Sequence, residues 1–537
     1  MKARLPILMI LLAVLMACGW IKPVPSAPGT STALPATTVT TATTVPTPTV
    51  VASTLTVEPS TPEAPGWEWP RSTPEEQGLS SDRLAAMLEA VRQDNINVHS
   101  VVVIRHGVLV LEAYNHPFNA QTRHAVYSVT KSITSTLVGI ASAQGLLAVD
   151  APVISFFPSV NLDDERKESI RVEHLLSMSS GVEWMEPLYS GLNDHLGMLE
   201  ADNPAQYFFT PALLAEPGTV FNYNSGGSHL LSMLVQSVSG QPAAELAAAQ
   251  LFAPLDIRAF SWKSDFTGHS QGGTGLELLP VDMAKIGQMM LNTGQWRSTQ
   301  VLPTAWVKTA TEAHVQSSPE MGYGYQWWIS PQGDYYALGW GGQQIHVFPE
   351  QDMVVVFTAG VSGSEVLHHE LINTYLLPAV VSKDAIPVDS QAQARLKDAI
   401  QGLASPRVQV SAPFSPLASE VDGRQWLVTG RNDWSMFSLH FLSDSEARLD
   451  LELDKEMMPL LVGLDGIYRI TDNAEYGPIA LLGYWESTDI FVLVQQNLRE
   501  ADKRITHLKF SGAAVKLFSE WFVEPHTEES EAVIFGK

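Results

Sequence analysis

The sequence predicts an α+β domain followed by a separate antiparallel β domain, either a barrel or a sandwich. Strand-like runs occur at 100–104 and 108–113. A long stretch with helical periodicity follows, and strand-like runs occur again only at 335–358. Strands at both ends of a domain with helices between them favour one antiparallel sheet beside a helical region. Beyond Pro387 the pattern changes to short β-prone runs separated by turn residues, which is typical of an all-β domain.

Composition and charge limit the classes of function. The chain has 537 residues, of which 45% are hydrophobic and 17% charged, so a wholly disordered chain is excluded. The net charge of −25 argues against nucleic acid as a partner, because an acidic surface repels phosphate. The single cysteine, Cys18, excludes an intrachain disulfide and a cysteine zinc site.

The first 18 residues have the pattern of an export signal. Lys2 and Arg4 precede an apolar run at 5–17, which is too short for a membrane span but suits a signal peptide. The run ends in Leu-Met-Ala-Cys-Gly at 15–19, which resembles the lipobox of bacterial lipoproteins. This resemblance implies that the chain is cleaved before Cys18, that Cys18 is lipidated and becomes the mature N-terminus, and that the protein is exported and membrane-anchored in the cell envelope. The alternative is an uncleaved signal anchor.

Residues 19–66 are predicted to be a disordered linker. Between 23 and 65 there are 13 Thr, 9 Pro and 4 Ser, and no aromatic residue. Such a segment buries too little apolar surface to offset the entropy of ordering it, and its prolines keep it extended. We therefore expect a spacer between the membrane anchor and the folded part of the chain.

The first folded domain is predicted over 67–383. Ser80 is placed to cap a helix at 81–94, and Arg105-His106-Gly107 to connect a hairpin. Further helices are predicted at 129–144, 171–180, 226–239, 280–293, 303–313 and 364–376, and late strands at 335–338, 344–348 and 353–358.

The second folded domain is predicted over 384–537. We find no chemical constellation in it, so an accessory role is the expectation. Its β-prone runs lie at 425–429, 435–441, 447–453, 466–471, 479–485, 490–495, 505–510 and 514–518.

The first chemical motif is Ser128-Val-Thr-Lys131 at the start of an apolar helix. A spacing of three places Ser128 and Lys131 on one helical face. A serine hydroxyl becomes a good nucleophile when a nearby neutral amine takes its proton, and burial keeps an amine neutral. Alone, the motif is also what a capping serine followed by a surface lysine would give. It is the only Ser-x-x-Lys in the chain, which favours catalysis.

Two further segments carry candidate site residues. Tyr223 lies in the turn-rich stretch 217–227, where a phenol near Lys131 can act as a general base and then protonate the leaving group. Ser225 in the same stretch is placed to hydrogen-bond the substrate or Lys131. Taken singly, a tyrosine packing a loop is the simpler interpretation.

The third segment is Gly339-Trp340-Gly341-Gly342, at the end of the strand 335–338. A backbone N–H here, assigned to Trp340 within one or two residues, can form an oxyanion hole with the N–H of Ser128. Gly339 and Gly341 are further candidates for binding the oxyanion or the substrate. An ordinary glycine-rich turn is the alternative.

Together and in this order, these motifs resemble the serine β-lactamase-like family. That family includes class C β-lactamases, penicillin-binding proteins, D-amino-acid peptidases, family VIII esterases and 6-aminohexanoate-dimer hydrolases. The resemblance covers about 67–383 and implies a β-lactamase/transpeptidase-like fold. It also implies that Ser128 is acylated, with Lys131 as proton acceptor and Tyr223 as the second acid–base group, before water attacks the acyl-enzyme.

The sequence departs from the penicillin-recognising members. These carry Lys-Thr-Gly or His-x-Gly on the last active-site strand, where this chain has Ala337-Leu338-Gly339. The groups that would hold a β-lactam carboxylate are missing. Tyr223-Asn224-Ser225 is closer to the aminohexanoate-dimer hydrolases and related esterases than to class C enzymes.

We therefore predict a serine hydrolase that cleaves a small ester or amide. No metal or organic cofactor is implied, and the membrane is contacted only through the anchor. One alternative is a non-catalytic module that binds cell-wall peptides, and another is a true β-lactamase or D-amino-acid peptidase.

Overall fold

The computed structural model describes residues 54–57, 67–186, 193–363, 366–407, 415–430, 434–453, 455–474, 476–523 and 525–534. The predicted signal peptide with Cys18, and the predicted linker apart from 54–57, lie outside these residues. Residues 51–537 form one compact unit, and everything below refers to it. The boundary predicted between 383 and 384 stays a prediction.

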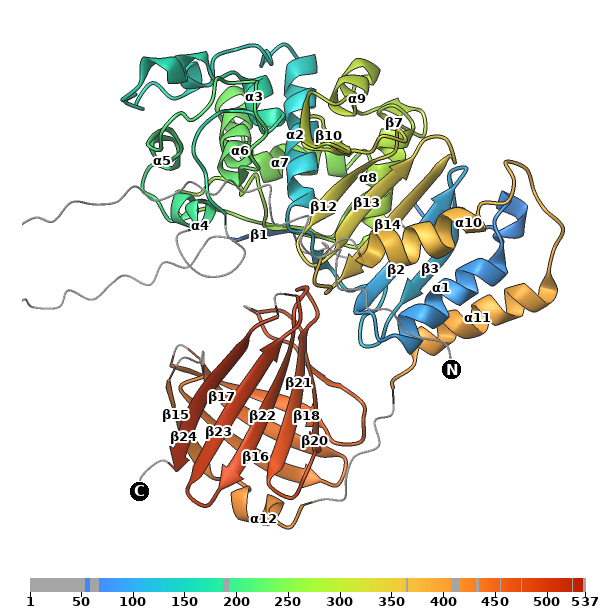
Figure 1. Ribbon diagram of the computed structural model, residues 1–537, viewed down its shortest axis with the longest axis vertical. Helices are drawn as coiled ribbons and strands as arrows, with labels where there is room; N and C mark the ends of the chain where they lie inside the picture. Colours follow the sequence, from blue (N-terminus) through green and yellow to red (C-terminus); the bar gives the residue numbers. More distant parts are fainter. Residues whose placement is uncertain are drawn as a thin grey trace, which may run out of the picture. The chain divides into compact units, whose positions relative to one another are not determined.

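The first part of the chain is built on an eight-stranded antiparallel sheet (Figure 1). Its order is β3-β2-β14-β13-β12-β11-β10-β9, so an early hairpin pairs with late strands. Val102 of β2 lies opposite Val356 of β14, which confirms that the two ends share one sheet. The strands are β2 Val98–Arg105, β3 Val108–Tyr114, β9 Val315–Ser318, β10 Met321–Tyr323, β11 Trp328–Ile329, β12 Tyr335–Gly339, β13 Gln343–Phe348 and β14 Met353–Ala359.

Helices cover both faces of this sheet, which explains why its central strands read as continuous apolar runs. Along β2, Val101 and Val103 pack with α1, whereas Val102 and Ile104 join the larger core shared with α2 and α8. The main helices are α1 Ser81–Gln93, α2 Val129–Ala143, α3 Val172–Leu176, α4 Asp194–Leu199, α5 Pro204–Phe209, α6 Ser225–Ser239, α7 Ala243–Ala247, α8 Pro280–Leu291, α9 Thr304–Ala310, α10 Leu377–Ala379, α11 Ser390–Ala404 and α12 Ala418–Val421.

Short elements complete this part of the chain. A small sheet has the order β1-β5-β6-β4, and β7 pairs with β8. Their bounds, with those of the 3-10 helices η1 to η3 and the π-helices η4 and η5, are β1 Thr54–Val57, β4 His124–Ala125, β5 Phe260–Lys263, β6 Leu276–Leu278, β7 Gln295–Trp296, β8 Thr299–Gln300, η1 Glu75–Gln77, η2 Val153–Phe156, η3 Glu165–Ser169, η4 Ala248–Phe252 and η5 Val366–Leu376.

The long helices of the first part agree with the sequence prediction, whereas the short helices α4, α5, α7 and α12 were not predicted. Ser80 caps α1 as predicted, accepting from the backbone N–H of Arg83 at 3.4 Å. The helix predicted at 171–180 stops at Leu176, and Met178 adopts a positive φ of 57°. Helix α11 was not predicted. Its apolar side chains Leu396 and Leu403 are buried in the core cluster that includes α1.

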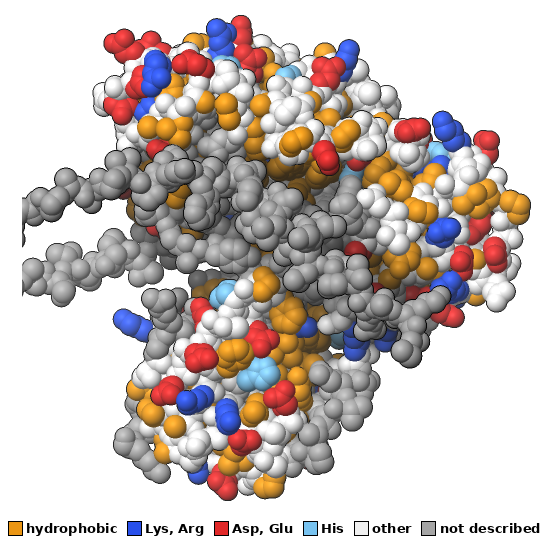
Figure 2. Space-filling model, in the orientation of Figure 1, with side chains coloured by type: hydrophobic (Ala, Val, Ile, Leu, Met, Phe, Trp, Pro, Cys, Tyr) orange, Lys and Arg blue, Asp and Glu red, His pale blue; other side chains and the backbone are white. Residues whose placement is uncertain are grey.

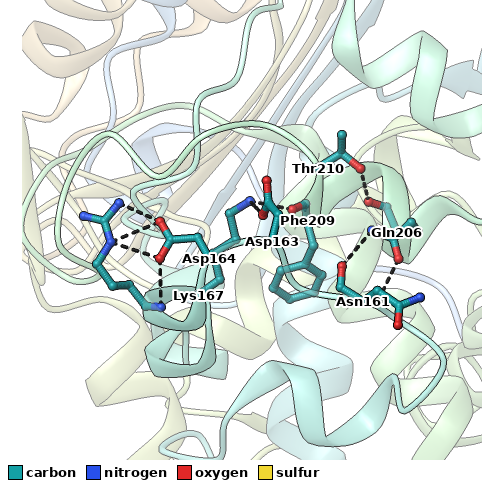
Figure 3. Close-up of polar contacts among 8 residues, drawn as sticks. Asn161, Asp163, Asp164, Lys167, Gln206, Phe209 and Thr210 are labelled. Atoms are coloured by element: carbon teal, nitrogen blue, oxygen red, sulfur yellow. Dashed lines mark hydrogen bonds and ion pairs between the residues drawn. The ribbon is translucent and has the colours of Figure 1, made fainter.

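A buried lysine ties the helical region together (Figure 3). Lys167, whose side chain is fully buried, donates to Asp163 Oδ1 at 2.6 Å and to the carbonyl oxygen of Phe209 at 2.7 Å. The side chain of Gln206 accepts a hydrogen bond from the backbone N–H of Asn161 and donates one to its carbonyl oxygen. These contacts hold the 161–167 segment against α5, because a buried ammonium must keep its partners.

The C-terminal part of the chain forms a closed nine-stranded barrel. Nine strands pair as antiparallel neighbours from β18 round to β20, and a parallel pairing of Gly463 with Leu482 closes the ring. The predicted all-β fold is thus confirmed, as a barrel. Its strands, with the flanking β19, are β15 Gln425–Gly430, β16 Met436–Ser443, β17 Glu446–Leu453, β18 Glu456–Gly463, β19 Arg469–Thr471, β20 Ile479–Trp485, β21 Ile490–Asn497, β22 Lys503–Ser511, β23 Ala514–Trp521 and β24 Thr527–Ile534.

The acidic charge is dispersed on the visible face of the molecule. Figure 2 shows acidic side chains interspersed with basic ones rather than gathered into a single patch. On this face the negative balance is therefore a general surface property. Among the helices of the described residues, none combines the length and the apolarity that a bilayer crossing requires.

Two buried histidines, His99 and His124, are in contact with each other, and their burial predicts that stability depends on pH. His124 Nδ1 donates to the carbonyl oxygen of Ala125 at 2.8 Å, so its Nε2 must accept from Nδ1 of His99, at 2.9 Å. Burial lowers the pKa of His124 to about 4 and that of His99 well below its ordinary value. A proton on His124 Nε2 would place two donors face to face.

We therefore expect the protein to lose stability as pH falls below about 6.5 towards 4. The unfolded chain binds these protons more readily, which at pH 5 costs about 2 kcal/mol for His124 alone. Thermal melts of wild type and His124→Gln at pH 7 and pH 5 measure the effect. The wild type should lose more than the variant between the two pH values, and equal losses would contradict the assignment.

Candidate active site

Ser128 lies immediately before the first turn of α2, which spans Val129–Ala143. The preceding residue, Tyr127, has a φ of 45°, in the left-handed region that side chains other than glycine rarely adopt. Such strain is common where a fold presents a reactive side chain. Ser128 is half-buried, whereas the residues that follow it in α2 are buried.

Lys131 is buried one turn further along and contacts Ser128 directly. Its side-chain Nζ lies 2.9 Å from Ser128 Oγ and donates to the carbonyl oxygen of Gly273 at 2.8 Å. The residue is 2% exposed. Within the part of the chain that the structure describes, Lys131 forms no ion pair with a carboxylate. An amine held there without a counter-ion, against a serine hydroxyl, has the surroundings that a proton acceptor needs.

Tyr223 lies close to the same amine. Lys131 Nζ is 4.9 Å from the centre of the Tyr223 ring, and that ring stacks on Trp328 at 6.2 Å. The tyrosine precedes α6, which begins at Ser225 with Asn224 as its cap. The structure therefore brings Ser128, Lys131 and Tyr223 together from the starts of two helices, although Ser128 and Tyr223 lie 95 positions apart in the sequence.

The end of β12 lies against the backbone of Ser128. A Cβ atom placed on Gly339 would lie 2.3 Å from the carbonyl oxygen of Val126 and 3.3 Å from the backbone nitrogen of Ser128. Trp340 follows, with its ring edge-on to Tyr127 at 5.0 Å. Gly341 has a φ of 76° and begins the turn into β13. The predicted oxyanion-hole residues thus flank the candidate nucleophile.

This close approach predicts a large effect for Gly339→Ala. The added methyl group must displace a backbone carbonyl, which cannot swing away as a side chain can, so β12 is forced off the nucleophile. We expect kcat to fall by about a hundredfold, the scale of losing one oxyanion donor. Gly402→Ala in α11 is the matched control, because its new methyl group would meet only Arg92, at 3.8 Å or more. Equal kcat in both variants would contradict the placement of β12.

Ser225 lies near this cluster but its hydroxyl has a different partner. Its Oγ donates to Glu186 Oε2 at 2.8 Å and its backbone N–H donates to Oε1 at 2.5 Å. Trp184 Nε1 donates to the same carboxylate at 2.5 Å. Among the described residues no hydrogen bond joins Ser225 to Lys131, so its place here is at the start of α6, two residues after Tyr223.

Of the two neighbouring tryptophans, Trp327 lies in the core and Trp328 lies beside the candidate site. Trp327 is 1% exposed and packs edge-on against Tyr335 in the main core. Trp328 is half-buried and forms an aromatic surface with Tyr223 and Tyr323. Burial raises the pKa of Tyr323 well above its ordinary value, so this neighbouring phenol stays protonated.

The sequence analysis did not identify several residues that lie beside the candidate site. Gly273 and Glu186 were not singled out, although the Gly-Gly pair at 272–273 is a detectable signal of close backbone approach. His195 also lies here: its Cε1 would be 3.5 Å from a Cβ on Gly273. Burial and the nearby Lys131 hold the pKa of His195 well below its ordinary value, so the ring is neutral. No group of three potential metal ligands occurs within the described ranges.

Comparison with known proteins identifies the family of this chain. The Beta-lactamase family matches residues 84–372, more than half of the chain. A 6-aminohexanoate-dimer hydrolase from Paenarthrobacter ureafaciens is 26% identical over 341 residues, covering 59% of this chain and 86% of the relative. Esterase EstB from Burkholderia gladioli is 28% identical over 204 residues, covering 34% of this chain and 52% of the esterase.

A solved structure, that of EstCE1, a hydrolase with promiscuous acyltransferase activity, superposes with a TM-score of 0.48 at 18% identity. It covers 56% of this chain and 99% of the other. The family match spans α1 to η5 and therefore includes every site residue described above. The chain belongs to the β-lactamase family and is a serine hydrolase.

Proposed function

We propose that the protein hydrolyses a small ester or amide through an acyl-enzyme on Ser128. The observation that carries the proposal is the 2.9 Å contact between Lys131 Nζ and Ser128 Oγ, made by a buried amine. In the first step Lys131 takes the hydroxyl proton while Ser128 Oγ attacks the substrate carbonyl carbon. The backbone N–H groups of Ser128 and Trp340 bind the oxyanion that forms.

Tyr223 completes the cycle in this proposal. Its phenol lies beside the lysine amine and exchanges a proton with it, so that the leaving alkoxide or amine departs protonated. Water then attacks the acyl carbon, and its proton returns along the same groups as Ser128 Oγ is released. The ring of Trp328 behind Tyr223 keeps the phenol in place and presents an apolar wall to the substrate.

The substrate class follows from β12 and from the named relatives. Ala337 is buried and Leu338 is half-buried, so β12 presents no cation or hydroxyl for a β-lactam carboxylate at these positions. The two relatives in the comparison are named as a dimer hydrolase and as an esterase. Both points favour ester or amide hydrolysis over β-lactam turnover.

A substrate panel tests the proposal. Purified protein is assayed with p-nitrophenyl acetate, a short aliphatic amide and a chromogenic cephalosporin. Turnover of the ester or amide well above that of the cephalosporin supports the proposal. Faster turnover of the cephalosporin would identify a β-lactamase, and no turnover with no labelling by a fluorophosphonate would leave only a binding module.

We also propose that the protein is exported and anchored by a lipid on Cys18. The support is the sequence pattern at 1–19, with its basic start, its apolar run and its single cysteine. Membrane fractionation of cells producing wild type and Cys18→Ser tests this. The wild type should sediment with membranes and the variant should not, and equal sedimentation would contradict lipidation.

A further inference from the structure

A loop of the C-terminal barrel contacts the residue that precedes the nucleophile. The loop 498–502 joins β21 to β22. The Tyr127 hydroxyl donates a hydrogen bond to Glu500 Oε2 and accepts one from the backbone N–H of Ala501 at 3.2 Å. The phenol therefore uses both its donor and an acceptor position on residues that lie 373 and 374 positions away.

Other contacts fix the same loop in place. The backbone N–H of Ala125 donates to the carbonyl oxygen of Arg499 at 2.7 Å, and Arg499 lies 3.8 Å from the carboxylate of Glu277. Ala501 packs where Gly360 has no side chain, since a Cβ on Gly360 would lie 2.0 Å from the Ala501 carbonyl oxygen. The loop is thus seated by backbone, charge and shape together.

Tyr127 connects this loop to both oxyanion-hole donors. It is bonded covalently to Ser128, and its ring lies edge-on to Trp340 at 5.0 Å. Its own φ of 45° is a strained conformation for a residue other than glycine, and it persists only where surrounding contacts impose it. The loop 498–502 supplies two such contacts at the far end of the side chain. Burial raises the pKa of Tyr127 well above its ordinary value, which keeps the phenol protonated as the donor to Glu500.

We propose that Glu500 is a positioning residue for acyl transfer, acting through Tyr127 on Ser128 and Trp340. This inference rests on the proposed function. The barrel is then a required part of the active site, because its loop holds the backbone that carries the nucleophile and the oxyanion donors. Glu500 does not touch the substrate in this scheme, so its effect falls on the rate of acylation.

The test compares Tyr127→Phe, Glu500→Ala, the double variant and Glu500→Gln in the full chain. The readouts are the second-order rate of labelling by a fluorophosphonate, kcat and KM for p-nitrophenyl acetate, and the melting temperature. We expect each single substitution to slow labelling and lower kcat by about tenfold, with KM nearly unchanged, and the double variant to lose no more than either. Glu500→Gln keeps an acceptor oxygen for the phenol and should recover most of the rate.

Glu531→Ala is the matched control. It removes a glutamate from β24 whose side chain is 67% exposed and lies 3.7 Å from Lys516 on the barrel surface. The inference would be overturned if Glu500→Ala were labelled at the wild-type rate. It would also be overturned if the two tenfold losses multiplied in the double variant. Either result would leave the proposed function standing. The inference would likewise be overturned if the labelling rate fell only in step with the melting temperature and fell equally in Glu531→Ala. A wild type that does not label would overturn the proposed function, and this inference with it.

Discussion

Replacing Ser128 with alanine should abolish hydrolysis and labelling by a fluorophosphonate. The variant keeps the fold, because the hydroxyl makes no capping bond to α2 and its contact is with Lys131. Without Oγ there is no atom to acylate, and we expect kcat to fall by at least about a thousandfold, as in other serine hydrolases. Mass spectrometry of intact protein after exposure to the probe measures this directly.

A second serine on the same helix is the control for that experiment. Ser132 is buried and donates to the carbonyl oxygen of Gln326 at 2.6 Å, away from the lysine amine. Ser132→Ala should label at nearly the wild-type rate, with a moderate loss of stability from one missing buried hydrogen bond. A Ser128→Ala protein that labels as fast as wild type would show that the nucleophile lies elsewhere.

Replacing Lys131 with methionine should cost nearly as much activity. Methionine fills a similar volume but cannot accept the proton of Ser128, so the hydroxyl remains a poor nucleophile. We expect the labelling rate to fall by about a hundred- to a thousandfold, the range for loss of a general base. Measuring the rate between pH 6 and pH 9 separates this from misfolding, because a higher hydroxide concentration should partly restore a serine that lacks its base.

Lys285 provides the comparison. It is also buried, but it pairs with Asp282 at 2.8 Å and donates to the carbonyl oxygen of Asp256 at 2.7 Å, within the core beneath the sheet. Lys285→Met leaves a buried carboxylate without its partner and should lower the melting temperature by several degrees. Its labelling rate per folded molecule should stay close to wild type. If the two variants lost activity in parallel, the amine of Lys131 would have a structural role only.

Local patterns were sufficient to predict much of the fold. The apolar runs of β2 and β14 have no polar alternation because both of their faces are covered, and such runs are easily identified as buried strands. The helix predicted at 171–180 was too long, since the apolar residues continue to Met178 although the chain turns there. Helix α11 was missed because its period gives a narrow apolar stripe next to a change in composition.

The candidate site was partly predictable for a different reason. Ser128 and Lys131 are three residues apart, so helix geometry alone brings them together. Tyr223 and Trp340 could be added only because their motifs occur in a known order. Nothing local marks Glu500, because a glutamate in a barrel loop is an ordinary surface residue, and only its long-range hydrogen bond to Tyr127 distinguishes it. A contact between residues so far apart in the sequence depends on how the barrel packs against the first part of the chain, and no local pattern encodes that packing.

The ring of the C-terminal barrel has a consequence for association between molecules. Each of its nine strands has paired neighbours on both sides, although β18 and β20 share only the pair Gly463–Leu482, so among the described residues the ring leaves few backbone groups open, apart from the outer edge of the flanking β19. The eight-stranded sheet, by contrast, ends at β3 and β9. Addition of a strand from another copy would therefore start more readily at an open edge such as β3 or β9 than within the ring of the barrel.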